Sequence, residues 1–222
     1  MSERIKLYGY WRSSAAYRVR ICLNLKQLSY QSQSIHLLRE GGEQHSAEYH
    51  RLNAAELVPV LVDGEVCLNQ SLAIIQYLDD EYSSNIVIPT QTPLRYQALA
   101  LAQDIAVDVH PLNNLRVLQY LERELGCEQS AKVKWMHHWI GQGFSALEEK
   151  LAKHRAEQGS CRFSVTDTPS IADVCLVPQV YNAQRFAVDM SPYPLINSIV
   201  AACNQQQAFI DALPENQEDA GS

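Results

Sequence analysis

The 222-residue chain lacks any apolar run that approaches the roughly 18 residues needed to span a bilayer. Its opening residues, Met1 to Ile5, are polar and contain no hydrophobic signal-peptide core, because they lead at once into a strand-like pattern. These two absences predict a cytoplasmic protein that has no membrane among its partners.

Basic residues are scarce relative to acidic ones. The chain has 18 Lys and Arg against 25 Asp and Glu, which gives a formal net charge of −7, and it contains no basic run. A protein that binds a phosphate backbone usually needs a basic face, so nucleic acid is not an expected partner. Hydrophobic residues make up 46% and charged residues 19%, which is ordinary for a globular chain with a sizeable core.

Motifs that bind metals or form redox pairs are also missing. The six cysteines never occur as C-x-x-C, which excludes a zinc ribbon and a thioredoxin-type dithiol. His137 and His138 are adjacent and would point in different directions on a helix, so they form a poor joint metal site. No H-E-x-x-H, P-loop or G-x-G-x-x-G motif is present. We therefore expect no metal, and cysteines that are buried hydrophobes or idle thiols.

The N-terminal part of the chain alternates between strand and helix patterns. After the strand-like residues 5–10, apolar side chains recur at helical spacing from Ala15 to Leu23. Asp63-Gly64 is a strong hairpin turn. The patterns predict strands at 5–10, 30–36, 58–62 and 66–68, and helices from 14, at 46–52 and at 70–82. This β-α-β-α-β-β-α order implies parallel pairing first and an antiparallel hairpin at one edge.

The sequence changes character after residues 84–93, where Ser, Asn, Thr and two prolines indicate an interdomain linker. Beyond it strand patterns are almost absent. Helical patterns cover 94–124, with a bend expected near Pro111, then 131–154, a segment after the capping box at 170–173, and 196–209. The polar residues 214–222 are expected to form a flexible tail. The predicted division is a domain at 1–83, the linker, an all-helical domain at 94–213 and the tail.

An α/β domain followed by an all-α domain in this order resembles the cytosolic glutathione transferases, with a thioredoxin-like domain and a C-terminal helical bundle. Local motifs resemble those of the zeta class, and the match runs from Ile5 to Phe209. The motifs are RSSAAYRVRICL (12–23), LVPV (57–60), NQSLAIIQYL (69–78), HPLNNLR (110–116) and LVPQVYNAQRF (176–186). The best-known activity of that family is maleylacetoacetate isomerisation in tyrosine and phenylalanine breakdown. The resemblance implies glutathione as cofactor, a small dicarboxylate substrate, a homodimer and transferase side activity.

Glutathione chemistry requires a thiolate, and lowering the thiol pKa by about 2 units needs about 2.7 kcal/mol of preferential stabilisation. A hydroxyl donor at a helix N-terminus can supply it. Ser13 and Ser14 lie where the first strand becomes a helix, and the resemblance assigns the catalytic hydroxyl to Ser14. Without the family motif, an N-cap would be the favoured role of either serine. Tyr8 and Tyr10 are rival donors, for which packing on a sheet face is the favoured interpretation.

The resemblance also implies a set of glutathione contacts. Gln70 and Ser71 begin a helix whose free N–H groups can receive the γ-glutamyl carboxylate, a role compatible with simple capping. A cis bond before Pro59 would let the Val58 backbone pair with the tripeptide; otherwise this is a plain strand start. The remaining contacts implied by the family are Ser13, Ser14, Ala15, Gln44, His110, Asn114, Leu115 and Arg116.

For some of these positions an alternative stays open. Gln44 taken alone is an ordinary exposed glutamine, and His110, where some relatives have glutamine, is equally a surface or core histidine. Ala15 replaces the cysteine of many zeta members, which argues against chemistry that needs an enzyme thiol there. Tyr17 also replaces a frequent Trp.

A substrate with two carboxylates favours arginine, whose fork pairs with a carboxylate in bidentate fashion. Arg185 matches the family position for this role, and Arg12 is a second candidate whose alternative is a solvated loop charge. Arg18 and Arg20 are expected to be structural. Asp173 belongs to the capping box and is not expected to be a catalytic acid.

Three other functions remain open from the sequence. Maleylpyruvate isomerisation uses similar chemistry, and glutathione transfer to small haloacids is within reach of the same fold. A non-catalytic transferase-like binding protein would be expected to have a degraded glutathione site. The presence of Ser14, Val58-Pro59 and Gln70-Ser71 disfavours that last alternative.

Overall fold

The computed structural model describes residues 5–221, which divide into two compact units. The first unit combines Met1–Val87 with the segment that begins at Gln205, and the second is Ile88–Asn204. The polar start predicted at residues 1–4 and the end of the predicted tail, Ser222, lie outside the described residues.

The first unit is built on a four-stranded sheet in the order β2-β1-β3-β4. Strand β1 (Ile5–Gly9) pairs in parallel with β2 (Tyr30–Ser34) and antiparallel with β3 (Val60–Asp63). Strand β4 (Val66–Asn69) returns antiparallel to β3 through a two-residue turn at Gly64-Glu65, one residue later than predicted, because Asp63 still belongs to β3 and pairs with Val66. The predicted order of elements and the mixed pairing are confirmed.

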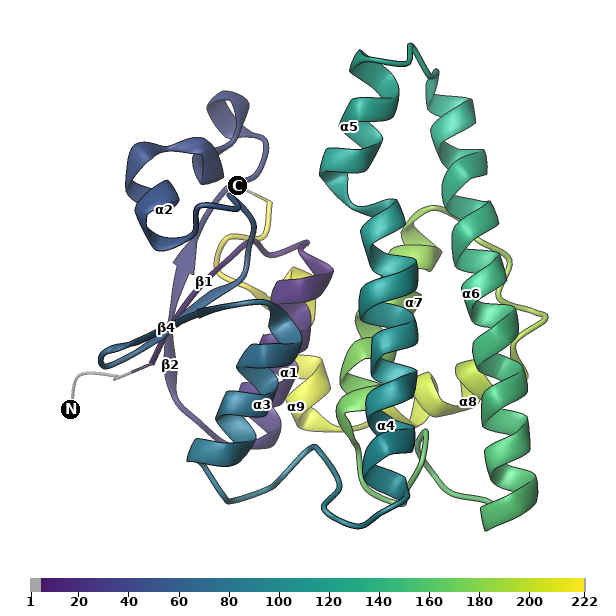
Figure 1. Ribbon diagram of the computed structural model, residues 1–222. Coiled ribbons are helices and arrows are strands. Elements are labelled where there is room, and N and C mark those ends of the chain that lie inside the picture. The colour runs from purple at the N-terminus through teal and green to yellow at the C-terminus, as the bar shows by residue number, and fades with distance from the viewer. Residues whose placement is uncertain (1–4, 222) are drawn as a thin grey trace. The chain divides into compact units, whose positions relative to one another are not determined.

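Helices cover both faces of this sheet. Helices α1 (Ser14–Leu25) and α3 (Ser71–Glu81) lie side by side on one face, and α2 (Ala47–Leu52) lies on the other (Figure 1). Side chains alternate across a strand. Leu7 is therefore buried in the core, while its neighbour Tyr8 lines a cavity beside α2.

The C-terminal segment belongs to this first unit, which differs from the predicted domain boundary at 213. Helix α9 (Gln207–Asp211) packs against α1, where Asn24 Nδ2 donates to the carbonyl of Ala208 at 3.0 Å. The predicted single helix 196–209 is interrupted because α8 (Pro194–Cys203) ends at Cys203 and α9 packs on different neighbours. Within the segment predicted as a flexible tail, Pro214–Asn216 forms a 3₁₀ turn and Asp219 accepts two hydrogen bonds.

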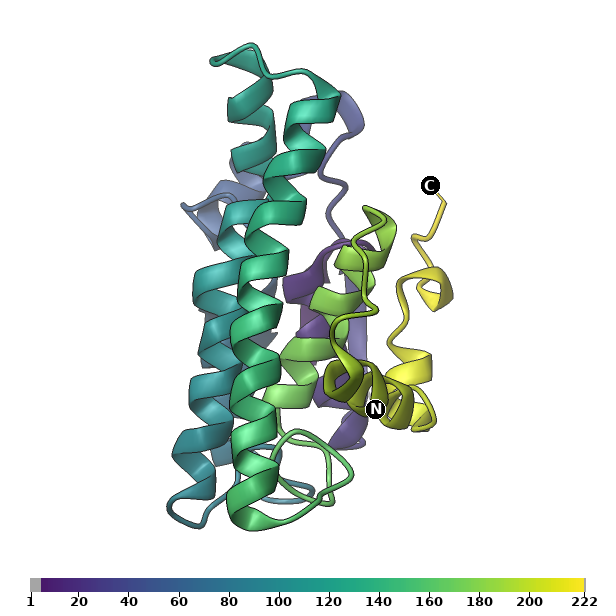
Figure 2. The same cartoon turned by 90° about the vertical axis from the view of Figure 1, so that its right-hand side faces the viewer.

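Within the described residues, the second unit consists of helices joined by loops and contains no strand. The predicted stretch 94–124 bends and breaks into several elements near Pro111. Helix α6 (Gln129–Gln158) packs against the π turn and the 3₁₀ turn of this stretch, and it runs alongside α4 (Leu94–Gln103) in both views (Figures 1 and 2). The elements are α4 (Leu94–Gln103), a π turn (Asp104–Val109), a 3₁₀ turn (His110–Asn113), α5 (Leu115–Arg123), α6 (Gln129–Gln158), α7 (Ile171–Arg185) and α8 (Pro194–Cys203).

Two local features fix this unit. A Cβ on Gly143 of α6 would fall 2.2 Å from Val109 Cγ2, so the helix approaches the π turn as closely as a glycine allows. The fully buried Asp173 accepts from the backbone and hydroxyl groups of both Ser164 and Ser170 at 2.7–2.9 Å. The bond from the Ser170 N–H belongs to the predicted capping box, and together the four bonds use both carboxylate oxygens in folding. No helix within residues 5–221 combines the length and apolar character needed to cross a membrane.

Candidate active site

Three predicted segments of the site meet at one edge of the sheet. The register pairs Tyr8 with Val60 and Val60 with Asn69, so β1 and β4 end where β3 begins. Beyond these pairs lie residues 10–14, 58–59 and 70–71. The sheet therefore brings together Ser13, Ser14, Ala15, Val58, Pro59, Gln70 and Ser71, and with them the N-termini of α1 and α3. The loop that carries Gln44 leaves the same edge, because Gly9 pairs with Ser34 at the end of β2.

The close approach of α1 to β1 fixes the first of these segments. A Cβ on Gly9 would lie 3.1 Å from the Cβ of Ala16, so the small residues at both positions let the helix start directly against the strand end. A larger side chain at either position would push the first turn of α1 away from the sheet edge.

The two serines differ in what their hydroxyl groups do. Ser13 is the N-cap of α1, with extended backbone angles, and its Oγ accepts from the Ala16 N–H at 3.2 Å. Ser14 is the first helical residue, and within residues 5–221 no group is hydrogen-bonded to its hydroxyl. The helix N-terminus therefore offers one hydroxyl that is already used and one that is free to serve a ligand, at the positive end of the helix dipole.

The start of α3 is held by a buried arginine of α1. Arg18, 2% exposed, donates from Nη1 to Ser71 Oγ at 3.2 Å, which fits its expected structural role. Gln70, at the N-cap position, has φ 69° and ψ 110°, which is a costly conformation for a residue with a Cβ. Such conformations cluster at binding sites, and this one presents the first N–H groups of α3 at the sheet edge.

The segment before Val58 is anchored by its carbonyl groups. Tyr49 Oη donates to the carbonyl of Leu57 at 2.8 Å, and Asn53 Nδ2 donates to the same oxygen at 2.7 Å. The Val58-Pro59 peptide bond is cis, as the family resemblance implies. Burial raises the pKa of the Tyr49 hydroxyl, with a smaller contribution from Cys67, so it stays a hydrogen-bond donor over the whole physiological range.

Gln44 is buried, in contrast to the exposed glutamine that the sequence left open. Only 7% of the residue is accessible. Its Nε2 lies 3.4 Å from the Leu37 carbonyl and 3.0 Å from His45 Nε2. Its Oε1 is buried and has no hydrogen-bond partner in the described chain. An unpaired buried acceptor is costly, and a ligand N–H would remove that cost.

Arg12 is oriented by aromatic neighbours and is not a freely solvated charge. Its guanidinium carbon lies 4.5 Å from the centre of the Trp11 ring, and Nη2 donates to Tyr10 Oη at 3.1 Å. The rival donor Tyr10 is therefore engaged with Arg12. The other rival, Tyr8, faces the α2 side of the sheet, where it lines a cavity of about 520 Å³.

Two residues that position the serine loop were not singled out from the sequence as doing so. Arg20, expected only to be structural, donates to the carbonyls of Trp11 at 2.9 Å and Tyr10 at 3.5 Å. Asp219, from the expected flexible tail, accepts from the Trp11 N–H at 3.1 Å and from Ser34 Oγ at 2.9 Å. No local motif marks an acidic residue more than 200 positions away as a partner of this loop.

The helical unit gathers the remaining predicted residues around the start of α5. His110 opens the 3₁₀ turn, and Asn114 caps α5 by accepting from the Arg116 N–H at 3.2 Å. Leu115 lines a cavity of about 200 Å³ together with Phe186. Arg185, exposed at the end of α7, has its guanidinium carbon 5.3 Å from the centre of the Phe186 ring.

The site is suited to an anionic peptide more than to a metal. No cluster of three or more His, Cys, Asp or Glu side chains within residues 5–221 is arranged to hold a metal ion. The first unit instead supplies two helix N-termini, a free serine hydroxyl and an unpaired buried amide oxygen. These groups fit the carboxylates, thiol and peptide N–H groups of glutathione.

Comparisons with known proteins agree with this geometry. A family described as "Glutathione S-transferase, N-terminal domain" matches residues 7–86. A Vibrio cholerae protein named as a probable maleylacetoacetate isomerase is 59% identical over 214 residues, which cover 96% of this chain and 97% of that protein.

Two solved structures are similar over almost the whole chain. The holo structure of a bacterial zeta-class maleylpyruvate isomerase has a TM-score of 0.93 at 41% identity and covers 97% of this chain and 100% of its own. A maleylacetoacetate isomerase from Methylobacterium extorquens AM1, solved with malonate and glutathione, has a TM-score of 0.92 at 34% identity, with coverage of 98% and 100%. The chain therefore belongs to the glutathione transferase family, in the zeta class that includes the maleylacetoacetate isomerases.

Proposed function

We propose that this chain is a glutathione-dependent cis–trans isomerase that converts maleylacetoacetate to fumarylacetoacetate in tyrosine and phenylalanine breakdown. The observation that carries the proposal is the Ser14 hydroxyl. It lies at the first residue of α1 with no hydrogen bond to any other described group, beside a second helix N-terminus and the cis Val58-Pro59 bond. The high identity to a protein named for this activity supports the choice of substrate.

Glutathione would be held by the groups at the sheet edge. The N-terminus of α3, with Ser71, would bind its γ-glutamyl carboxylate, the Val58 backbone would pair with its peptide backbone, and Gln44 would contact it through the amide. When bound, glutathione supplies a thiolate that adds to the double bond, permits rotation about the resulting single bond, and leaves again.

The chain's own residues would tune that chemistry. Ser14 would donate to the sulfur, and together with the positive end of α1 it would lower the thiol pKa. Arg185 would pair with a substrate carboxylate, and Arg12 is the second candidate for that role. A guanidinium near the reacting ketone would also stabilise negative charge that develops on its oxygen.

A homodimer in the cytoplasm is part of the proposal. Two-fold pairing is the commonest assembly of soluble oligomers. Size-exclusion chromatography with light scattering tests it, since the monomer has a mass of 25.0 kDa and a dimer would have twice that mass.

The activity is tested by supplying freshly made maleylacetoacetate to the purified protein with and without glutathione, with fumarylacetoacetate hydrolase as the coupling enzyme. We expect glutathione-dependent turnover at about 1–10³ s⁻¹. Arg185→Ala should mainly raise KM for the substrate. Arg185→Lys keeps the positive charge but loses the bidentate guanidinium, so its KM should lie between those of the unmodified protein and Arg185→Ala. Absence of turnover by a well-folded protein would contradict the proposal.

Maleylpyruvate isomerisation is the second candidate, favoured by the similarity to a maleylpyruvate isomerase at a TM-score of 0.93. The two substrates share a cis double bond conjugated to a ketone and differ in the group that the acceptor pocket must hold. The ratio of kcat/KM for the two compounds, measured on one preparation, decides between them.

A further inference from the structure

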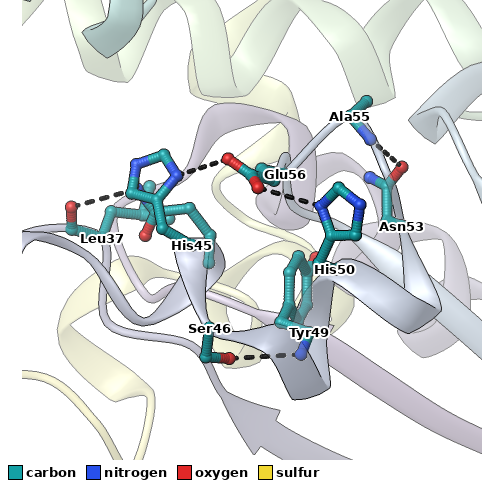
Figure 3. Close-up of polar contacts among 9 residues, drawn as sticks. Leu37, His45, Ser46, Tyr49, His50, Asn53, Ala55 and Glu56 are labelled. Atoms are coloured by element: carbon teal, nitrogen blue, oxygen red, sulfur yellow. Dashed lines mark hydrogen bonds and ion pairs between the residues drawn. The ribbon is translucent and has the colours of Figure 1, made fainter.

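A carboxylate outside the sites already described, Glu56, joins His45 and His50 (Figure 3). His45 directly follows Gln44 in the chain. Glu56 Oε2 lies 2.5 Å from His45 Nδ1, and Glu56 Oε1 lies 2.9 Å from His50 Nδ1. A carboxylate can only accept, so both Nδ1 atoms donate. Glu56 therefore fixes the orientation of the His45 ring and leaves its Nε2 to interact on the other side.

That second ring nitrogen contacts the Gln44 amide. His45 Nε2 lies 3.0 Å from Gln44 Nε2, which is an NH₂ group and can only donate. The contact is a hydrogen bond only when His45 Nε2 accepts, which means that His45 is neutral. In this arrangement the Gln44 Oε1 is the buried acceptor that has no partner in the described chain.

Protonation of His45 would reverse the polarity of this contact. An Nε2–H would face the Gln44 NH₂, so that two donors would meet, and only a half-turn of the amide would restore a hydrogen bond. The amide has little other freedom. A Cβ on Gly42 would lie 2.4 Å from its Nε2 and 2.7 Å from its Oε1, so the amide packs directly against the Gly42 backbone.

We propose that His45 is a positioning residue for glutathione: in its neutral form it turns the Gln44 oxygen towards a peptide N–H of the ligand, and in its protonated form it turns that oxygen away. The inference rests on the proposed function, because it takes Gln44 as a glutathione contact. It goes beyond that function by making the affinity for glutathione respond to a histidine that does not touch the ligand.

Glu56 is the charged group in direct contact with the His45 ring, and His50 shares it. The hydrogen bonds from His45 and then His50 hold the pKa of the Glu56 carboxyl below its ordinary value, so Glu56 is ionised throughout the range in which histidines titrate. Glu43 accepts from the His36 N–H and pairs with Arg39. The other titratable side chains that line the adjoining cavity are Tyr8, Glu40, Glu48 and Tyr49. Arg51 follows His50 on α2, and His36 Nδ1 accepts from the Leu38 and Arg39 N–H groups.

The test is the affinity for S-methylglutathione, measured by titration calorimetry across about pH 5 to 8. This ligand has no thiol to titrate, and its remaining ionisations are common to all protein variants. His45→Asn keeps an amide donor near the Nδ1 position and removes the Nε2 contact. His50→Asn is the matched control, because it alters the other partner of the same carboxylate and leaves Gln44 untouched.

We expect Kd of the unmodified protein to rise about 2–10-fold as pH falls through one ionisation, which corresponds to one hydrogen bond. His50→Asn should keep this step, and His45→Asn should lose it. His45→Gln places an uncharged amide near the Nε2 position, so its Kd should also be independent of pH. This variant replaces His45→Asn in the test if His45→Asn folds poorly.

Two results would overturn the inference alone: a step that persists in both His45 variants, or an affinity that improves as pH falls. If no protein binds S-methylglutathione at any pH, both the inference and the glutathione-dependent function fail. A histidine NMR titration of the ligand-free protein adds a readout that does not depend on activity. The Gln44 side-chain amide signals should shift in step with the His45 ring signals in the unmodified protein and in His50→Asn.

Discussion

The division of labour between Ser13 and Ser14 can be tested by exchanging each for alanine. Ser13 Oγ caps α1 through the Ala16 N–H at 3.2 Å, so Ser13→Ala removes an N-cap. The usual cost is about 1 kcal/mol, which lowers Tm by about 2–4 °C in a protein of this size. Ser14 makes no such bond, so Ser14→Ala should leave Tm nearly unchanged.

For catalysis we expect the opposite order: Ser14→Ala should have the larger effect and Ser13→Ala the smaller one. A hydrogen bond to a charged group contributes about 1.5–3 kcal/mol. At 1.36 kcal/mol per pKa unit, its loss in Ser14→Ala would raise the thiol pKa of bound glutathione by about 1–2 units. A thiol whose pKa has been lowered by about 2 units from about 8.5 is mostly ionised at pH 7, so the rate at neutral pH should then fall about 3–30-fold and recover as pH rises towards the new pKa. Ser13→Ala should change kcat only slightly.

The assay combines thermal unfolding with the ultraviolet absorbance of the bound thiolate and with kcat, each followed against pH. The reasoning would be refuted if Ser13→Ala lost the thiolate signal at an unchanged Tm while Ser14→Ala unfolded earlier and kept its activity. That outcome would make Ser13 the donor to sulfur and Ser14 the structural residue.

Three further predictions concern the supports of the site. Gly143→Ala should lower the free energy of unfolding, because overpacking against Val109 costs about 1–3 kcal/mol and the gain in helix propensity is only about 1 kcal/mol. Gly141→Ala is the matched control, because its Cβ would meet only Tyr193 Oη, at 3.6 Å. In thermal unfolding this control should be neutral or stabilising. Tyr49→Phe should lower the free energy of unfolding by about 0.5–1.5 kcal/mol and raise Kd for glutathione. The difference in stability between the variant and the unmodified protein should be constant from acid to mildly alkaline pH, because burial raises the pKa of the Tyr49 hydroxyl and it keeps its proton. A difference that disappears near neutral pH would contradict this. Asp219→Ala should accelerate hydrogen exchange at the Trp11 amide and raise Kd for glutathione a few-fold, while Asp211→Ala, on the same C-terminal segment, should leave that amide protected.

Much of the fold was predictable because its signals are local. The helical spacing after Ser14, the hairpin around Gly64 and the Ser170–Asp173 capping box each depend on residues within a few positions. The structure confirms the helix and the capping box, and it places the hairpin turn at Gly64-Glu65, one residue later than predicted. The order of elements followed from these signals, and so did the mixed sheet.

The sequence predicted which residues form the site but not what each of them does. The motifs identified Ser13 and Ser14 as a pair, yet the sequence pattern alone would assign a cap to either one. Only the extended backbone of Ser13, with the bond from Ala16 to its Oγ, shows that this serine caps the helix and leaves the other hydroxyl free. Gln44 likewise could not be recognised as buried, because its burial depends on a loop folded around Gly42.

The sequence by itself determined the elements, their order and the family motifs, because periodicity, turns and caps are properties of neighbouring residues. Tertiary structure alone decided which distant groups meet. It brought Asp219 to the loop before the serines, Arg18 to Ser71, and Glu56 to His45 and His50. These contacts form only when the whole domain packs, and no local sequence pattern shows that these residues will lie close together.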